Sequence, residues 1–225
     1  MSTHFGFTFV GTVMSTGPNV DSVKPGDRKY ALALEENTLR LDPKTTFEDA
    51  SRVIASRATV ISAVNIYMGL SLPPRVLIYG GSSAVGGLAV KYTPDAGYDV
   101  VTTSSTTNRK LVERRNATHI IDHCLLKEDI LRQVRAYGPY EGIFEATGSQ
   151  ATTQLMVELL REPGGQFFST GPSPGDNELP QNVQKKWAAY SATLVSQEAN
   201  RELCLWWYLR SYLPEALKNG LVWPA

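Results

Sequence analysis

The chain has 225 residues with 22 basic and 22 acidic side chains, and it is long enough for one large core or two small ones. This balance of charge excludes a field that would attract nucleic acid or an anionic membrane, and two cysteines are too few for a disulfide framework. No apolar run reaches the roughly 20 residues of a membrane-spanning helix, and nothing at the N-terminus resembles a signal segment. We therefore expect a cytoplasmic globular protein.

The pattern of the chain changes near residue 74. Before it, the stretches FTFVGTVMSTGPNV and YALALEENTLRL predict short β-strands, with turn signals at Gly17-Pro18-Asn19 and Pro25-Gly26-Asp27. Residues 47–69 then predict a helical region that leads to Pro73-Pro74.

From Arg75 onward, short apolar strands alternate with helical segments. The strands are predicted at 76–79, 98–103, 119–122, 142–146 and 166–170, and the helices at 84–92, 108–115, 127–137 and 152–161. This alternation is typical of βαβ units and predicts an α/β fold with a parallel sheet covered by helices. Beyond it, RELCLWWYLRSYLPEALKNG predicts a helical C-terminal region with an apolar side.

A turn rich in glycine and serine lies in the stretch RVLIYGGSSAVGGLAVKY, residues 75–92. A nucleophile elbow needs glycines two residues before and two residues after its serine, and neither Ser82 nor Ser83 has both. A phosphate-binding loop of a nucleoside triphosphatase needs a lysine directly after its last glycine, and here Gly87 follows Gly86.

Dinucleotide binding fits this turn better. Gly81-x-Ser83-x-x-Gly86 keeps the first glycine of the dinucleotide fingerprint, for the tight turn, and the third, for close packing of helix and strand. The next helix begins at this point, so its free N–H groups would face the phosphates. The residues predicted to hold the pyrophosphate are Gly81, Ser82, Ser83, Ala84, Val85 and Gly86. An ordinary strand-to-helix turn remains the alternative.

Three segments of this region, VLIYGGSSAVGGLAVKY, GYDVVTTSSTTNRKLVERRNATHIIDH and YEGIFEATGS, resemble the cofactor domain of zinc-independent medium-chain dehydrogenase/reductases, in the fungal group of ToxD-like and trans-acting enoyl reductases. FVGTVMSTGPNVDSVKPGDR is similar to the segment of that family that reads FAGTV…VG…GDRV. The resemblance implies a Rossmann-type doubly wound parallel sheet and an incomplete, β-rich GroES-like N-terminal domain. The implied boundaries are 1–46 for the truncated substrate domain, 47–74 for a hinge helix, 75–182 for the NADP-binding domain, and 183–225 for a C-terminal strand and helices.

The second strand bears on the choice of cofactor. NAD sites usually end this strand with an acid, whereas VVTTSSTTNRK offers hydroxyl groups followed by cations, which suit the 2′-phosphate of NADP. A polar loop that only caps the next helix is the alternative. The residues concerned are Ser104, Ser105, Thr106, Thr107, Asn108, Arg109 and Lys110. By resemblance, residues 105–108 hold that phosphate and His123 stands where the family has a tyrosine beside the adenosine.

The resemblance also assigns residues to the nicotinamide end of the cofactor. It places Thr59 beside the nicotinamide and the substrate as the one catalytic candidate, although a threonine on a buried helix face is an equally good interpretation. By the same resemblance, Thr147 and Gly148 would lie along the nicotinamide ribose, and Ser169, Thr170 and Gly171 would contact the nicotinamide.

No metal is expected. His119 and His123 stand four residues apart on one strand, roughly 13 Å at strand rise, too far to share one zinc ion. Two cysteines also exclude a structural zinc site with four cysteine ligands.

The resulting hypothesis is an NADPH-dependent oxidoreductase that passes hydride to the β-carbon of an activated double bond, as in enoyl reduction in secondary metabolism. The implied partners are a small-molecule or carrier-bound unsaturated substrate and a polyketide synthase, with a monomer or homodimer as the assembly. The family has a half-barrel before its F-x-G-T-V segment and a loop after GDR, and by this resemblance we expect the substrate domain of this chain to be incomplete. The alternative is therefore a catalytically impaired NADP-binding remnant that acts as a partner or sensor protein.

Overall fold

The computed structural model describes residues 10–21, 23–30, 39–64, 68, 75–172, 179–187 and 211–218. The chain divides into two compact units, one formed by residues 1–58 and 190–225 and the other by residues 59–189. The predicted C-terminal helical region lies largely outside the described residues, and its described part contains α8 (Leu213–Lys218). The domain boundaries given above stay a prediction.

The first unit carries a small antiparallel sheet. Strands β1 (Val10–Thr12), β2 (Arg28–Tyr30) and β3 (Leu39–Arg40) lie in this order in the sheet. Between β1 and β2 the backbone turns at Gly26, whose φ of 93° is a left-handed conformation that glycine adopts readily. The Asp27 N–H donates to the Lys24 carbonyl at 3.1 Å and closes the turn, so the predicted turn at Pro25-Gly26-Asp27 is confirmed.

Helix α1 (Phe47–Ser62) begins where the sequence predicts a helical region. The Asp49 N–H donates to Thr46 Oγ1 at 3.0 Å and the Thr46 hydroxyl donates to the Asp49 carboxylate at 2.6 Å, a reciprocal cap that fixes this start. The α-helix ends at Ser62 and residues 63–64 continue it as a wider π-helical turn, where the Met68 N–H donates to the Ala63 carbonyl at 2.8 Å. The end of the predicted helical region, residues 65–67 and 69, lies outside the described residues.

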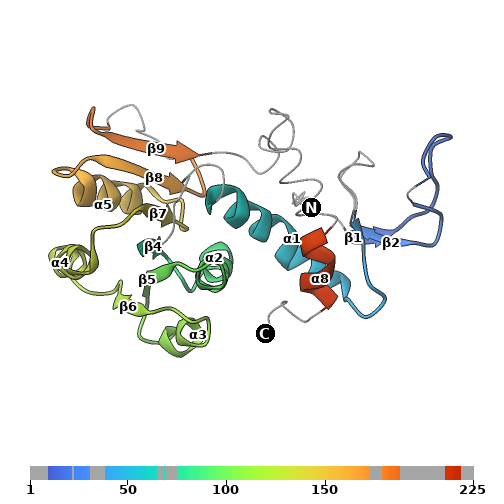
Figure 1. Cartoon of the computed structure of the whole chain (residues 1–225), viewed down its shortest axis with the longest axis horizontal. Coiled ribbons are helices and arrows are strands. Elements are labelled where there is room, and N and C mark those ends of the chain that lie inside the picture. The colour runs from blue at the N-terminus through green and yellow to red at the C-terminus, as the bar shows by residue number, and fades with distance from the viewer. Residues whose placement is uncertain are drawn as a thin grey trace, which may run out of the picture. The chain divides into compact units, whose positions relative to one another are not determined.

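The second unit is built on a six-stranded sheet (Figure 1). Its strands are β4 (Arg75–Tyr79), β5 (Asp99–Ser104), β6 (His119–Asp122), β7 (Gly142–Glu145), β8 (Gly165–Ser169) and β9 (Val183–Trp187). All neighbouring pairs are parallel and the order is β6-β5-β4-β7-β8-β9. This is the doubly wound Rossmann order, so the fold prediction is confirmed, and the order reverses between β4 and β7.

Helices cover both faces of this sheet. Helices α4 (Lys127–Tyr137) and α5 (Gln150–Leu160) lie on one face in Figure 1, and α2 (Ala84–Asp95) and the short α3 (Arg109–Glu113) lie on the other. Strand β4 is apolar on both sides, with Val76, Leu77 and Ile78 fully buried, as expected of a central parallel strand. The core under α4 and α5 consists mainly of Leu77, Val101, Ile121, Leu131, Val134, Leu155, Met156, Leu159 and Phe167.

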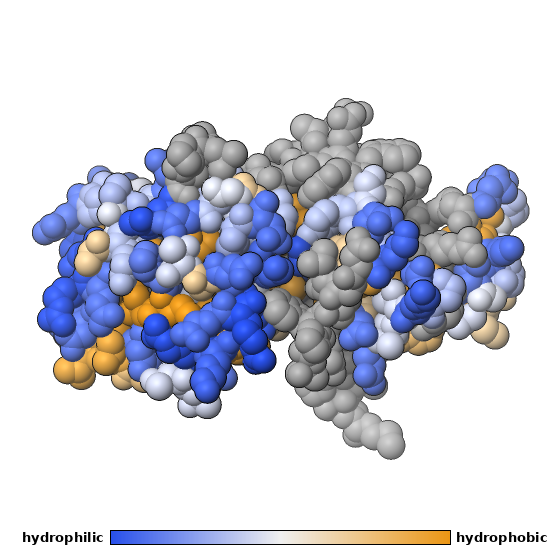
Figure 2. Space-filling view, turned by 60° about the horizontal axis from the view of Figure 1, so that its bottom comes forward, coloured by the Kyte–Doolittle hydropathy of each residue, from blue (hydrophilic) through white to orange (hydrophobic). Residues whose placement is uncertain are grey.

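The described surface in Figure 2 is mostly hydrophilic, with an apolar area on the part that carries the parallel sheet. Among the described residues, the large apolar side chains that are exposed are Met14, Leu125, Leu126 and Trp187. In the part of the chain that the structure describes, no helix has the length and apolar character needed to cross a membrane.

Candidate dinucleotide-binding site

The glycine turn after β4 lies against the end of β5. Gly80 has a φ of 91° and donates its N–H to Thr103 Oγ1 at 2.8 Å, and the Gly81 N–H donates to the Thr103 carbonyl at 2.9 Å. A Cβ atom on Gly81 would overlap Thr102 Oγ1, which is itself held by a 2.6 Å bond to the Ile78 carbonyl. Position 81 therefore admits only glycine without a shift of β5, as the first glycine of the fingerprint requires.

Helix α2 starts directly on this turn. Ser83 is its N-cap, and the Ser83 hydroxyl accepts a hydrogen bond from the Gly86 N–H at 3.0 Å. A Cβ atom on Gly86 would overlap the Gly80 carbonyl oxygen and lie 2.9 Å from its carbonyl carbon. Gly86 thus permits the close approach of helix and turn that the third glycine provides, while residues 82–85 stay partly exposed.

A buried carboxylate organises the loops after β7 and β8. Glu145, the last residue of β7, is fully buried and accepts hydrogen bonds from the Thr147 N–H at 2.7 Å and the Gly148 N–H at 3.0 Å. It also accepts from the hydroxyls of Thr147, Thr152 (3.0 Å) and Ser169 (2.7 Å). One side chain therefore ties together two loops that the sequence assigns to the nicotinamide end.

These two loops also touch each other and the glycine turn. Gly148 has a φ of 66°, and a Cβ atom on it would lie 3.2 Å from Thr170 Oγ1 and 3.3 Å from the Gly171 nitrogen. A Cβ atom on Gly80 would lie 2.8 Å from Thr147 Cγ2. Burial and the nearby Glu145 charge raise the pKa of Tyr79, so this phenol stays protonated at neutral pH.

The loops after β5 and β6 form the other end of the site. Ser104 is buried and donates its hydroxyl to the Ser105 carbonyl at 3.1 Å, and the His123 N–H donates to the Ser104 carbonyl at 3.2 Å. The Thr106 hydroxyl donates to Asp122 Oδ2 at 2.8 Å. The Cys124 N–H donates to the same carboxylate, and together these bonds lower the pKa of Asp122. A carboxylate therefore stands beside the loop predicted to hold a phosphate.

The two cations of this loop are exposed. Arg109 forms an ion pair with Glu113 at 3.0 Å and donates to the Ile120 carbonyl at 3.3 Å, while half of its side chain stays exposed to solvent. A surface pair of this kind contributes little free energy, so the guanidinium is able to exchange Glu113 for a phosphate.

The structure thus brings most of the predicted cofactor residues to the carboxyl ends of β4, β5, β7 and β8, around the point where the strand order reverses. Thr59 lies apart from these loops in the chain, on α1, where it is half-buried, and its role stays a prediction. Sequence reasoning missed Glu145, Asp122 and the buried Arg115. The one available signal was the acid within the apolar strand GIFEA.

Among the described residues, no three His, Cys, Asp or Glu side chains come together in a way that could hold a metal ion. Zinc independence remains a prediction.

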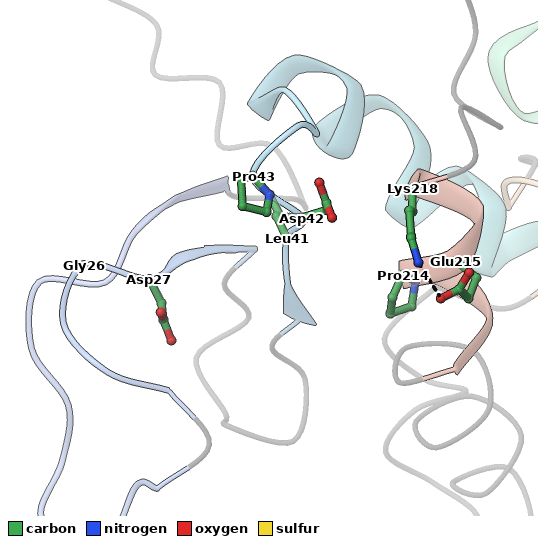
Figure 3. A pocket seen from close by; sticks show the side chains of 8 residues that line it. All are labelled: Gly26, Asp27, Leu41, Asp42, Pro43, Pro214, Glu215 and Lys218. Atoms are coloured by element: carbon green, nitrogen blue, oxygen red, sulfur yellow. Dashed lines mark ion pairs between the residues drawn. The ribbon is translucent and has the colours of Figure 1, made fainter.

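A separate pocket of about 470 Å³ lies within the first unit (Figure 3). Asp27 and Asp42 lie on one side of it, and α8 contributes Glu215 and Lys218, which pair at 3.7 Å, on the other. Among the described residues that line this pocket, none is predicted to bind the cofactor or the substrate.

The family model described as zinc-binding dehydrogenase matches residues 84–203, more than half of the chain. The chain belongs to this family. With the relatives given next, the match confirms the resemblance to medium-chain dehydrogenase/reductases of the fungal trans-acting enoyl reductase group, a group of enzymes.

Three proteins illustrate the similarity. The trans-enoyl reductase himH of Aspergillus japonicus is 25% identical over 245 residues, which cover 96% of this chain and 69% of that protein. The crystal structure of CurK enoyl reductase matches with a TM-score of 0.76 at 18% identity, over 96% of this chain and 68% of that one. The structure of mycobacterial Rv1454c complexed with NADPH matches with a TM-score of 0.73 at 18% identity, over 98% of this chain and 73% of that one. These structures show the shared fold.

Proposed function

We propose that the protein binds NADP(H) at the carboxyl edge of its parallel sheet and reduces an activated carbon–carbon double bond in secondary metabolism. The observation that carries the proposal is the close packing of the turn at the start of α2, where a Cβ atom on Gly81 would overlap Thr102 Oγ1 and one on Gly86 would overlap the Gly80 carbonyl oxygen. It lies where a Rossmann sheet binds dinucleotides, beside the reversal of strand order. Relatives named trans-enoyl reductases, and a structural neighbour complexed with NADPH, support the same assignment.

The residues present fit this cofactor. The turn of residues 81–86 would hold the pyrophosphate, because its partly exposed segment leads into the N-terminus of α2. The loop of residues 104–110 would hold the 2′-phosphate through hydroxyls and two cations. The loops that Glu145 holds, residues 147–148 and 169–171, would orient the nicotinamide end. When bound, NADPH supplies the hydride, and the protein supplies orientation and electrostatics.

The substrate proposed is an α,β-unsaturated ketone or thioester, free or bound to a carrier such as that of a polyketide synthase. Thr59 is the candidate for contact with it. We further propose that the protein is cytoplasmic and is a monomer or a homodimer. Residues 47–74 would form the hinge between its two domains.

A direct experiment separates this function from the alternative of a binding remnant without turnover. Purified protein is titrated with NADPH and then supplied with α,β-unsaturated ketones and thioesters while loss of NADPH absorbance is followed. Binding with turnover supports the reductase, binding without turnover supports the remnant, and absence of binding contradicts both. Elemental analysis of the same sample should find less than stoichiometric zinc, and a chelator should leave the melting temperature unchanged.

A further inference from the structure

We propose that Arg115 is a positioning residue of the dinucleotide site. It fixes the glycine turn by binding the Gly81 carbonyl, and its side chain fits there only because residue 87 is glycine. Arg115 follows α3 and is 7% exposed. Its guanidinium Nη1 donates a hydrogen bond of 2.9 Å to the Gly81 carbonyl oxygen. Gly81 is the first glycine of the fingerprint, so this bond reaches the backbone that shapes the phosphate turn.

Position 87 is shaped to receive this side chain. A Cβ atom on Gly87 would overlap Nη1 and Cζ of Arg115 and would lie 3.0 Å from Nη2. Gly87 lies in the first turn of α2 and its φ is not in the left-handed region, so the helix itself does not require glycine there. The missing side chain instead makes room for the guanidinium between α2 and the turn.

The charge of Arg115 has a consequence for binding. A guanidinium remains protonated in proteins, and burial only lowers the pKa of Arg115 from a value far above neutrality. The positive charge of Arg115, held at the Gly81 carbonyl, adds to the positive field at the N-terminus of α2. This field favours binding of the negatively charged pyrophosphate. The pyrophosphate is common to NADP and NAD, so Arg115 should strengthen the binding of both equally, whereas Arg109 and Lys110 should act on NADP alone. This inference rests on the proposed function.

The binding test compares Arg115→Leu with the charge-conserving Arg115→Lys. For Arg115→Leu we expect the Kd of both NADPH and NADH to rise about tenfold or more with their ratio unchanged, because the turn loses the bond that fixes the Gly81 carbonyl and the pyrophosphate loses a nearby positive charge. The KM for NADPH should rise in step while kcat at saturating NADPH stays that of the parent. Arg115→Lys should restore most of the affinity. An Arg115→Leu variant that binds both dinucleotides as the parent does, or that changes only their ratio, overturns the positioning role.

A stability test needs no dinucleotide. Gly87→Ala should lower the melting temperature of the parent, because the new methyl group displaces the guanidinium. In the Arg115→Leu background the same substitution should raise it, because alanine favours a helix over glycine. The same sign in both backgrounds overturns the contact. If the parent binds neither dinucleotide, the proposed function and the positioning role fail together, and the melting temperatures still report the contact. If the parent binds and Arg115→Leu binds equally, only the positioning role fails.

Discussion

The two ends of the candidate site are built differently. At the end proposed for the nicotinamide, one fully buried carboxylate, Glu145, receives hydrogen bonds from both loops. At the end proposed for the adenosine, residues 106–110 are exposed and their contacts, such as Thr106 to Asp122, form between surface groups. A buried network fixes geometry, which hydride transfer requires, whereas exposed contacts exchange readily for those of a ligand. The difference suggests that one end sets placement and the other sets cofactor choice.

The largest effect is expected where both ends meet, at the glycine turn. Gly86→Val should abolish binding of both dinucleotides, because a branched side chain would collide with the Gly80 carbonyl and push α2 off the turn. Ser83→Gly is the matched control, since glycine is an acceptable N-cap and costs only a few tenths of a kcal/mol. Calorimetric titration measures both variants, and binding by Gly86→Val at the affinity of the parent would show that the turn holds no phosphate.

At the nicotinamide end, Glu145→Gln should be the next most damaging change. An amide keeps the shape of the side chain but replaces one acceptor oxygen by a donor, so buried N–H and hydroxyl groups lose their partner. We expect a loss of about 1–3 kcal/mol in the free energy of unfolding, measured with urea.

Steady-state kinetics should show a lower kcat for Glu145→Gln with either cofactor, since the nicotinamide loops are no longer fixed. Glu145→Asp, which keeps the charge on a shorter side chain, should fall between this variant and the parent. A Glu145→Gln protein with the stability and kcat of the parent would show that the buried hydrogen bonds of Glu145 do not fix these loops.

At the adenosine end, the effect should be selective rather than general. Arg109→Ala with Lys110→Ala should weaken NADPH binding about tenfold and leave NADH binding unchanged, because only NADP presents the 2′-phosphate. Lys91→Ala is a matched control, since Lys91 also forms an ion pair on a helix surface, with Asp95 in α2. An equal loss for both cofactors would mean that the loop supports the fold rather than the phosphate.

The smallest change is expected at Asp122. Its carboxylate faces the predicted phosphate loop through Thr106, so Asp122→Asn should strengthen NADPH binding by about threefold, by a modest Coulomb term at an exposed site. Fluorescence titration at neutral pH tests the affinity, and unchanged or weaker NADPH binding would contradict the repulsion.

The same carboxylate also affects how stability depends on pH. Because the pKa of Asp122 is lowered in the fold, its contribution to stability is present above its unfolded pKa and is lost as pH falls through the folded pKa.

The parts of the molecule that local patterns determine were predictable from the sequence. The alternation of strands and helices gave β6 and α4 at their observed bounds, and the glycine spacing indicated the phosphate turn. Contacts between distant segments were not predictable. Glu145 meets Ser169, 24 residues later, and Arg115 within ERRN looks like part of a solvated charge run until the fold brings it to Gly81, 34 residues earlier. Thr106 was predicted as a phosphate ligand without its Asp122 partner, for the same reason.

Whether the exposed end of the site selects NADP is decided by titration of the unmodified protein with NADPH and with NADH. The fluorescence of the reduced nicotinamide, followed under identical conditions, gives both dissociation constants. We predict that NADPH binds about tenfold or more tightly than NADH, the value expected of a charged group held by hydrogen bonds. Equal affinities, or tighter binding of NADH, would contradict it.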